Sequence, residues 1–429
     1  MRSRRLLLAA ILLGCVVGRG VYVLHLVDSN AVVTTTGDTP SYLGPARELL
    51  DHGRFDSAST PIRPEFLRTP GYPVFIAAVY RVFGRSNTAV LLVQVALSAL
   101  TVFLAYLLAA RIWSVPIGLL AALLTTLEPL QNSTSATILT ESISALLLIM
   151  VAGAGFAALE DDPPRPARWA LLGLVIAAAT LVRPVTYYLP LLVLLLLLIR
   201  YARRRDRWLD LAKITAAFLA PLVLLVGGWQ FRNHERVDSW RISGIEGKNL
   251  YTFRAAGVVA RDTGISLADA RHKMFQLAGP IGTQSQGSYY GRMYRSGMHI
   301  LVSHPGDTII GIGQGLWSEL FGVRGKFFAY IGLDRVSGAI DVAAVVLLVA
   351  FYAVSVYGMV LVARRRRALL AHVFVVGIAF YVLLASAGPE AFGARGERFR
   401  APIMPILILY AAAGGHALYT RRARYGRVA

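Results

Sequence analysis

The sequence has few of the residues on which soluble enzymes rely. Charged residues occupy 16% of its 429 positions, whereas about 25% is usual in a soluble chain. Its one cysteine, Cys15, excludes a disulfide within the chain and a metal site built from several thiolates. The sequence has no Asp-x-Asp motif, and its eight histidines show no metal-ligand spacing. We therefore expect neither a metal nor a cofactor, which argues against an enzyme that uses soluble nucleotide sugars.

Hydrophobic residues take the place of the missing charge. They make up 56% of the sequence, and the mean hydropathy is +0.56. Several runs approach the ~20 apolar residues that cross ~30 Å of hydrocarbon. The sequence therefore predicts an all-α polytopic membrane protein. We expect spans near residues 6–27, 88–110, 115–130, 142–158, 169–182, 188–200, 209–229, 340–363, 369–387 and 402–419.

The basic residues form clusters at the ends of these apolar runs. The net charge is +20, and 40 of the 44 basic residues are arginine. The clusters are Arg2 to Arg5, Arg200 to Arg207, Arg364 to Arg367 and Arg421 to Arg427. Short cytoplasmic loops collect basic residues, so we predict cytoplasmic N- and C-termini and no nucleic-acid binding. The excess of arginine over lysine indicates a GC-rich genome, and hence the inner (cytoplasmic) membrane of a bacterium.

Polar stretches between the predicted spans divide the chain into three regions. Residues 1–230 form an N-terminal transmembrane module, whose first external loop, 28–87, contains an apolar helix at 71–83 that is too short to cross. Residues 231–339 form an external region with a possible juxtamembrane helix at 299–321. A crossing there would place the cluster at 364–367 outside. Residues 340–429 hold the last spans.

Charged residues outside the basic clusters gather at the outer ends of the spans. They are Asp38, Arg68, Glu141, Arg183, Arg232, Glu390, Glu397, Arg398 and Arg400. Arg183 stands between two very apolar segments, where a charge is costly unless a partner or a ligand is present. Guanidinium groups match phosphate oxygens, and a carboxylate can accept a proton from a hydroxyl. This is the minimal set for sugar transfer from a polyprenyl-phosphate donor.

Six short motifs occur in order along most of the chain. They are 37–42 (GDTPSY), 68–73 (RTPGYP), 139–141 (LTE), 181–184 (LVRP), 228–233 (GWQFRN) and 397–402 (ERFRAP). Together they resemble the GT-C superfamily of membrane glycosyltransferases, in particular glycosyltransferase family 39. That family includes the dolichyl-phosphate-mannose protein mannosyltransferases and the lipid A aminoarabinose transferase. The resemblance implies a GT-C-type bundle of about 10–11 transmembrane helices with external juxtamembrane helices.

The resemblance also implies roles for individual residues. Asp38 would be the catalytic base, Arg68 and Glu141 would form a charge pair that shapes the site, and Arg183 would bind the donor phosphate. Further candidates for phosphate binding are Arg232, Arg398 and Arg400. Possible substrate contacts are Tyr42, Tyr72, Tyr187, Asn233 and Glu397.

Two departures from the family leave the substrates open. The mannosyltransferases have Asp-Glu where this chain has Asp38-Thr39. The aminoarabinose transferase has Lys-Pro-Pro where this chain has Thr69-Pro70-Gly71. Each of these residues also has a simpler interpretation. Aspartate is common in turns, which would explain Asp38. An acidic residue is favoured at a helix N-terminus, which would explain Glu141, and an arginine is common at the end of a span, which would explain Arg232.

The sequence predicts an inverting glycosyltransferase whose site faces the outside of the membrane. Its partners would be the lipid bilayer, a polyprenyl-phosphate sugar donor, and a lipid, protein or polysaccharide acceptor. A transporter or a flippase for lipid-linked saccharides is the alternative. Transporters place charged residues near the middle of the membrane and often consist of repeated halves. In this sequence the centres of the predicted spans carry almost no charge, apart from Arg19 and Lys213, and the two halves show no repeat. A ligase of O-antigen or wall polymer is a third hypothesis.

Overall fold

The computed structural model describes residues 2–28, 37–57, 62–202, 207–323, 337–365, 368–388 and 396–425. These residues are almost entirely helical, as the sequence predicts. The β-structure of the described residues is one antiparallel hairpin, β1 (Asp56–Ser57) with β2 (Arg63–Pro64).

The predicted spans appear as helices at the expected positions. In the described part of the chain, 8 helical segments are long and apolar enough to cross a membrane, and α5 (Val115–Leu127) and α8 (Pro166–Val182) are shorter apolar helices. The single-helix spans are α1 (Arg2–Asp28), α4 (Asn87–Ile112), α7 (Glu141–Glu160), α18 (Ser337–Arg365) and α19 (Leu369–Ser386). The composite spans are η2 (Pro184–Thr186) with α9 (Leu189–Tyr201), α10 (Trp208–Leu222) with η4 (Val223–Gly227) and α11 (Gly228–Val237), and η7 (Gly396–Ile403) with α20 (Met404–Tyr425).

Shorter helices cover one end of this bundle. They are α2 (Pro40–His52), α3 (Gly71–Phe83), α6 (Pro129–Ser135), α12 (Ile245–Asn249), η5 (Leu250–Ala255), α13 (Ala256–Thr263), α14 (Leu267–Ala278), α15 (Gln286–Ser303) and α16 (Pro305–Phe321). The expected helix at 71–83 is α3. The expected single helix at 299–321 is divided between α15 and α16. His304 is extended (φ −127°) before Pro305, because a proline disfavours helical backbone in the residue that precedes it.

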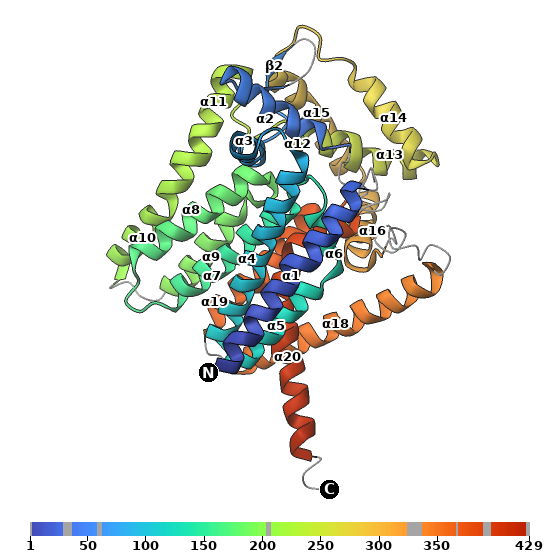
Figure 1. The fold of residues 1–429 in the computed structure, drawn as a ribbon. Coiled ribbons are helices and arrows are strands. Elements are labelled where there is room, and N and C mark those ends of the chain that lie inside the picture. The colour runs from blue at the N-terminus through green and yellow to red at the C-terminus, as the bar shows by residue number, and fades with distance from the viewer. Residues whose placement is uncertain are drawn as a thin grey trace.

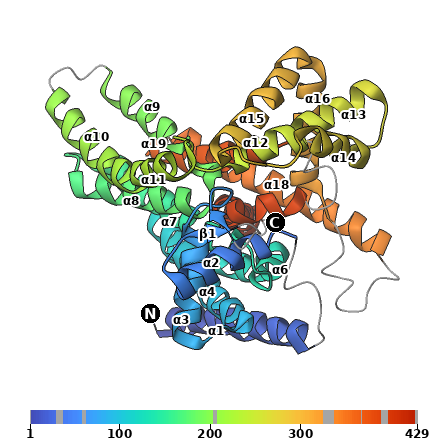
Figure 2. The ribbon, with the colours of Figure 1, turned by 90° about the horizontal axis from the view of Figure 1, so that it is seen from above.

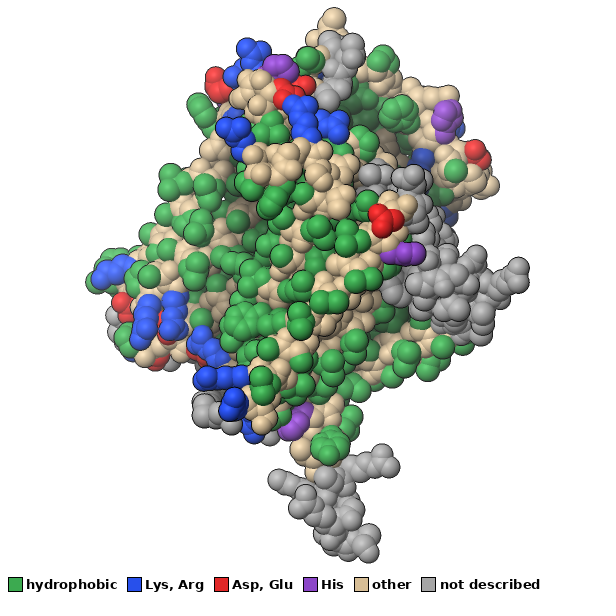
Figure 3. Space-filling model, viewed as in Figure 1, with side chains coloured by type: hydrophobic (Ala, Val, Ile, Leu, Met, Phe, Trp, Pro, Cys, Tyr) green, Lys and Arg blue, Asp and Glu red, His purple; other side chains and the backbone are tan. Residues whose placement is uncertain are grey.

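Apolar packing holds the bundle together, and apolar side chains also cover its outside. Trp169, Phe374 and Tyr410 lie in the main core, which α5, α7, α8, α9, α19 and α20 share. On the outer surface Leu224 is 73% exposed and Leu347 is 70% exposed. Such exposure is expected where lipid covers the surface, and Figure 3 shows hydrophobic side chains over the middle of one face with charged groups toward its ends. The chain is a multi-pass membrane protein.

Two glycines allow the closest helix crossing in the C-terminal part of the bundle. A Cβ atom on Gly358 of α18 would lie 2.1 Å from the carbonyl oxygen of Tyr410, and one on Gly414 of α20 would lie 2.3 Å from that of Val354. Small residues let helix backbones approach each other in membranes. The helices α18 and α20 therefore depend on glycine at both positions.

The covering helices mark one end of the bundle, here called the site end. Helix α1 begins and α20 ends at the opposite end, whereas α2, α3, α12 and α15 lie over the site end (Figure 1). Seen from above, α12 to α16 lie on one side, α8 to α11 on another, and α1 to α4 on a third (Figure 2). Segments far apart in the sequence therefore surround the middle of the site end.

Candidate active site

A cavity of about 510 Å³ lies at the site end. Its charged lining residues come from the first loop, from the ends of α7 and α8, from α12 and η5, and from η7. They are Asp38, Arg68, Glu141, Arg183, Glu246, Lys248, Arg254 and Arg398. Apolar side chains such as Leu139 and Val182 line the same space. The cavity thus combines charges of both signs with an apolar wall.

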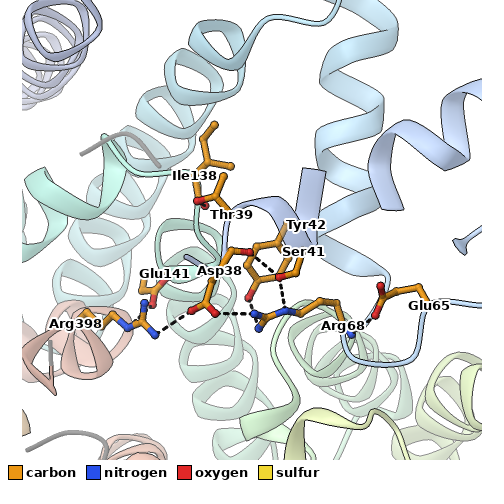
Figure 4. A network of polar contacts seen from close by, with 9 residues as sticks. All are labelled: Asp38, Thr39, Ser41, Tyr42, Glu65, Arg68, Ile138, Glu141 and Arg398. Atoms are coloured by element: carbon orange, nitrogen blue, oxygen red, sulfur yellow. Dashed lines mark hydrogen bonds and ion pairs between the residues drawn. The ribbon is translucent and has the colours of Figure 1, made fainter. Parts of the chain in front are cut away.

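Asp38 lies between two arginines at the edge of this cavity (Figure 4). Arg68 Nη2 is 2.8 Å from Asp38 Oδ1, and Arg398 Nη2 is 3.2 Å from Oδ2. The turn that carries Asp38 is fixed to the bundle because the Thr39 hydroxyl donates to the carbonyl of Ile138 at 3.2 Å. The Asp38 side chain is still 37% exposed, so a substrate can reach it.

The charges around Asp38 keep it ionised. Burial alone would raise the pKa of its carboxyl group, but the guanidinium groups of Arg68 and Arg398 outweigh burial and lower that pKa below the ordinary value. An opposite charge at hydrogen-bond distance favours the ionised form. Asp38 is therefore a carboxylate at neutral pH and has oxygens that can accept a proton.

Arg68 is held rigidly beside Asp38. Its Nε donates to Ser41 Oγ at 2.8 Å and its Nη1 to the Tyr42 hydroxyl at 3.0 Å. Its backbone N–H donates to Glu65 Oε1 at 2.8 Å, and its guanidinium carbon lies 4.4 Å from the centroid of the Tyr42 ring. Arg68 thus has few donors left for a ligand, and its contacts hold it against Asp38.

The second carboxylate of the site, Glu141, is buried beneath Arg398 and Arg183. Its side chain is 4% exposed, and Oε1 lies 3.4 Å from Arg183 Nη1 and 3.9 Å from Arg398 Nε. Arg183 reaches this position because the chain leaves α8 in extended conformation (φ −143°) before Pro184. Arg398 therefore contacts both Asp38 and Glu141.

This arrangement corrects the predicted charge pair between Arg68 and Glu141. In the structure Arg68 pairs with Asp38, and Glu141 pairs with Arg183. Figure 4 shows the reason: Asp38 lies between Arg68 and Arg398 and contacts both, and Glu141 lies beside Arg398 on the side away from Arg68. The prediction found the charged residues but exchanged their partners.

Two of the four arginines predicted to bind phosphate lie outside the cavity lining and donate to backbone carbonyls. Arg232 Nη1 donates to the Glu65 carbonyl at 2.6 Å and its Nη2 to the Phe55 carbonyl at 2.8 Å. Arg400 is buried, and its Nη1 donates to the carbonyls of Glu319 and Leu320 at 2.8 and 2.7 Å. These carbonyls end α16, where no partner within the helix exists. Of the four, Arg183 and Arg398 line the cavity and remain predicted phosphate ligands.

Of the predicted substrate contacts, one lines the cavity and the others lie outside its lining. Tyr42 lines the cavity. Tyr72 is fully buried and donates to Gln94 Oε1 at 2.6 Å, and the Tyr187 hydroxyl accepts from Gln230 Nε2 at 3.0 Å. Asn233 is fully buried and donates to the carbonyls of Arg241 and Ile242. Glu397 lies in η7 beside Gly322.

Part of the sequence prediction falls outside the described residues. Glu390 and some of the arginines in the basic clusters belong to this part. Among the residues that are described, no group of three or more His, Cys, Asp or Glu side chains could hold a metal ion.

The second wall of the cavity was not expected from the sequence. Glu246 and Lys248 come from α12, and Arg254 comes from η5, a π-helical turn. Such turns are rare and frequently occur at functional sites. Arg254 Nη2 donates to the Ala385 carbonyl at the end of α19 at 2.5 Å. No motif marks this segment, but its mixture of basic and aromatic residues in an external region was a signal.

Comparison with known proteins supports the fold. The family described as dolichyl-phosphate-mannose-protein mannosyltransferase matches residues 67–229. No curated protein matches the sequence. The oligosaccharyltransferase of Archaeoglobus fulgidus, tethered with an acceptor peptide containing the NVT sequon, is similar with a TM-score of 0.53 and 11% identity, over 96% of this chain and 50% of that one. The structure of the same enzyme in complex with an inhibitory peptide and a dolichol-phosphate is similar with a TM-score of 0.53 and 12% identity, over 97% of this chain and 51% of that one.

A third similar structure is ArnT from Cupriavidus metallidurans bound to undecaprenyl phosphate, with a TM-score of 0.42 and 15% identity over 93% of this chain and 78% of that one. The chain spans about half the length of the archaeal oligosaccharyltransferase that it matches. The matched segment 67–229 includes Arg68, Glu141 and Arg183. The chain thus has the all-helical fold of the GT-C membrane glycosyltransferases, and over residues 67–229 it resembles the dolichyl-phosphate-mannose protein mannosyltransferases.

Proposed function

We propose that the chain is an inverting glycosyltransferase that moves a sugar from a polyprenyl-phosphate-linked donor to an acceptor hydroxyl. The reaction takes place at the outer face of a bacterial cytoplasmic membrane. The observation that carries the proposal is the ionised Asp38 at a cavity that also holds Arg183 and Arg398. The match to dolichyl-phosphate-mannose protein mannosyltransferases supports it, as does the dolichol-phosphate bound to the archaeal oligosaccharyltransferase of similar fold.

In this reaction Asp38 acts as the general base. It accepts the proton of the acceptor hydroxyl while that oxygen attacks the anomeric carbon of the sugar. The bond between the anomeric carbon and the phosphate oxygen breaks, and the polyprenyl phosphate leaves with the electron pair. Attack opposite the leaving group inverts the anomeric centre. The proton that Asp38 gains leaves to water after the product departs.

Arg183 and Arg398 stabilise the charge that develops on the departing phosphate. Fixed charges directed at the leaving group lower the barrier most in a site from which water is excluded. Both guanidinium groups already lie at the cavity wall and pack on the ring of Phe399, 5.5 Å and 4.9 Å from its centroid. Both groups therefore already lie at the cavity before the donor arrives, and the phosphate has only to draw Arg398 away from the carboxylates that it contacts.

Arg398 also links donor binding to the strength of the base. It contacts Asp38 at 3.2 Å and Glu141 at 3.9 Å, so a phosphate near Arg398 competes with both carboxylates. When Arg398 turns toward the phosphate, Asp38 loses one of the two charges that lower its pKa. The donor thus makes Asp38 a better proton acceptor.

The test is Asp38→Asn, which keeps the shape of the side chain but removes the proton acceptor. Purified protein in nanodiscs would be mixed with radiolabelled polyprenyl-phosphate sugar, and donor binding and single-turnover transfer measured separately. We expect transfer to fall by at least ~10²-fold, the usual size of a general-base contribution, with donor binding largely kept. Asp51→Asn is the matched control, because Asp51 lies in the same external region and pairs with Arg85 on the surface.

The phosphate ligands are tested in the same assay. Arg183→Ala should weaken donor binding by roughly 1.5–3 kcal/mol, because a charge-assisted hydrogen bond to the phosphate is lost. Arg232→Ala removes an arginine that lies at the same end of the bundle but outside the cavity lining, and it should leave donor affinity near wild type. If Asp38→Asn keeps most of its transfer rate, Asp38 is a turn residue and the proposal fails.

A further inference from the structure

Glu319 is a buried carboxyl group that the proposed reaction does not use. It belongs to α16, and its side chain is 0% exposed. Within the described part of the chain neither of its carboxyl oxygens has a hydrogen-bond partner, although its backbone carbonyl accepts from Arg400. A buried carboxylate with no hydrogen bond is strongly unfavourable. The group must therefore either be neutral or be balanced by charges nearby.

Two arginines of the cavity wall supply those charges. Helix α16 packs against this wall, because a Cβ atom on its Gly315 would lie 2.3 Å from the backbone nitrogen of Gly388, and one on Gly388 would lie 3.1 Å from Arg254 Nε. Arg183, at the end of α8, and Arg254, on η5, both attract the Glu319 carboxylate, yet burial dominates and raises the pKa of Glu319 to about 8. Arg183 is also the proposed phosphate ligand, and Arg254 lines the same cavity. Glu319 does not line the cavity itself. Its charge nevertheless attracts Arg183 and Arg254, the two arginines that would contact a bound phosphate.

The other charged and titratable groups on elements packed against α16 are engaged elsewhere. Arg400 of η7 binds the carbonyls at the end of α16, and Arg398 of η7 contacts Asp38 and Glu141. Arg261 of α13 pairs with Asp307 at the start of α16. Other such groups on the described elements include Glu397 of η7, Asp262 of α13 and Tyr352 of α18, which donates to the Leu320 carbonyl. Arg295 and His299 of α15 line a separate surface pocket, and Tyr381 of α19 donates to the Val185 carbonyl.

We propose that Glu319 is a proton-dependent counter-ion of the phosphate site, which in alkaline solution is ionised when the site is empty and becomes neutral when a lipid phosphate lies beside Arg183 and Arg254. This inference rests on the proposed function, because the ligand is the lipid phosphate of that reaction. An ionised Glu319 competes with the phosphate for the two arginines. A neutral Glu319 leaves their full charge to the ligand. In alkaline solution, binding of the phosphate therefore takes up a proton from water, and release returns it.

This coupling makes the affinity for lipid phosphate depend on pH. Below about pH 8 Glu319 is already neutral in the free protein, so binding takes up no proton. Above that pH a proton must be bound, and the Kd should rise about tenfold between pH 7 and pH 9. A phosphate monoester has its second pKa near ~6 and arginine stays charged throughout, so neither contributes to this slope.

The experiment measures binding of farnesyl phosphate, a short lipid phosphate monoester, to the full chain in nanodiscs from pH 6.5 to 9.5. Wild type should lose about tenfold in affinity from pH 7 to pH 9, and Glu319→Gln should bind tightly with no slope. Asp307→Asn, on the same helix, should keep the slope of the wild type. Glu246→Gln should also keep it. Glu246 is a second carboxyl group at the cavity, whose pKa is raised by burial against the attraction of Arg241.

A second measurement needs no variant. Calorimetry of wild type in buffers of different ionisation enthalpy should show uptake of nearly one proton per phosphate at pH 9 and almost none at pH 6.5.

Several outcomes would overturn the inference. One is a Kd of wild type that does not change with pH, together with no proton uptake. Another is a pH dependence of Kd that persists in Glu319→Gln. A third is a pH dependence that only Glu246→Gln removes. If wild type binds farnesyl phosphate at no pH, the proposed function fails together with the inference. Binding without a slope refutes only the inference.

Discussion

Replacing Arg183 by methionine while Glu141 stays in place would leave a buried carboxylate without its nearest partner. Glu141 is 4% exposed, its Oε1 lies 3.4 Å from Arg183, and its Oε2 has no hydrogen-bond partner among the described residues. Breaking a buried pair by removing one partner commonly costs 3–5 kcal/mol, because the other charge remains buried. The variant should therefore be destabilised by much more than a surface substitution.

The neighbouring Arg398 sets the size of the effect. At an effective dielectric constant of about 20, unit charges at the 3.4 Å of the Arg183 pair attract by about 5 kcal/mol, and those at the 3.9 Å of the Arg398 contact by about 4 kcal/mol. Arg398 remains in the variant and offsets part of the loss. We expect Arg183→Met to cost about 2–3 kcal/mol. Glu141→Gln should cost less, about 1–2 kcal/mol, because Arg183 is more hydrated than Glu141.

The assay is chemical unfolding in detergent micelles, followed by tryptophan fluorescence, for wild type, both single variants and the double variant. The double variant should recover at least about 1 kcal/mol relative to the sum of the single effects, which is the signature of residues in contact. The exposed pair of Arg85 and Asp51 is the control and should couple by less than about 1 kcal/mol. Strict additivity for Arg183 and Glu141 would refute the pairing.

Three further predictions follow from the same structure. The pKa of Asp38 is lowered by Arg68 and Arg398 against the effect of burial, so kcat/KM should stay level as the pH falls from 7 to 5. It should decline only below the ordinary carboxyl value of about 4, whereas kcat, which reports the donor complex, should decline at a higher pH. An acid limb of kcat/KM near pH 6 would contradict this. Gly358→Ala places a Cβ 2.1 Å from the Tyr410 carbonyl oxygen and should cost about 1–3 kcal/mol in unfolding, whereas Gly153→Ala, with nothing within 4 Å, should be neutral. Arg232→Met should lose roughly 1.5–3 kcal/mol of stability through its two carbonyl contacts, and an equal loss of donor affinity would return Arg232 to the phosphate site.

The spans were predictable because they depend on a local property of the sequence. An apolar run of sufficient length predicts a crossing wherever it lies in the chain, and the helices of the structure follow these runs. The helix expected at 299–321 shows the limit of this reasoning. Its two apolar stretches are separated by 303–308 (SHPGDT), and α16 begins at Pro305 within this segment. The proline carried that information in the sequence.

The site was predictable as a set of residues but not as a set of contacts. Asp38, Arg183 and Arg398 meet because their motifs all lie at the same end of the spans. Arg398 and Arg400 were expected to act together, yet η7 is a 3-10 helix, in which residues two apart point in different directions. One therefore faces the cavity and the other faces α16. Arg254 and Glu319 lie in no motif, and only the folding of the external helices places Arg254 in the same cavity wall as Arg183.

The contact between Arg398 and Asp38 has a consequence for how the enzyme is made. The two residues are 360 positions apart in the chain, and at the usual rate of about 5–20 residues per second the ribosome needs on the order of tens of seconds to reach the second after the first. During that interval the growing chain has Asp38, the proposed base, but lacks Arg398, a proposed ligand of the leaving group. Under the proposed function, a chain that has not yet reached η7 should therefore transfer or hydrolyse lipid-linked sugar more slowly than a chain that contains Arg398.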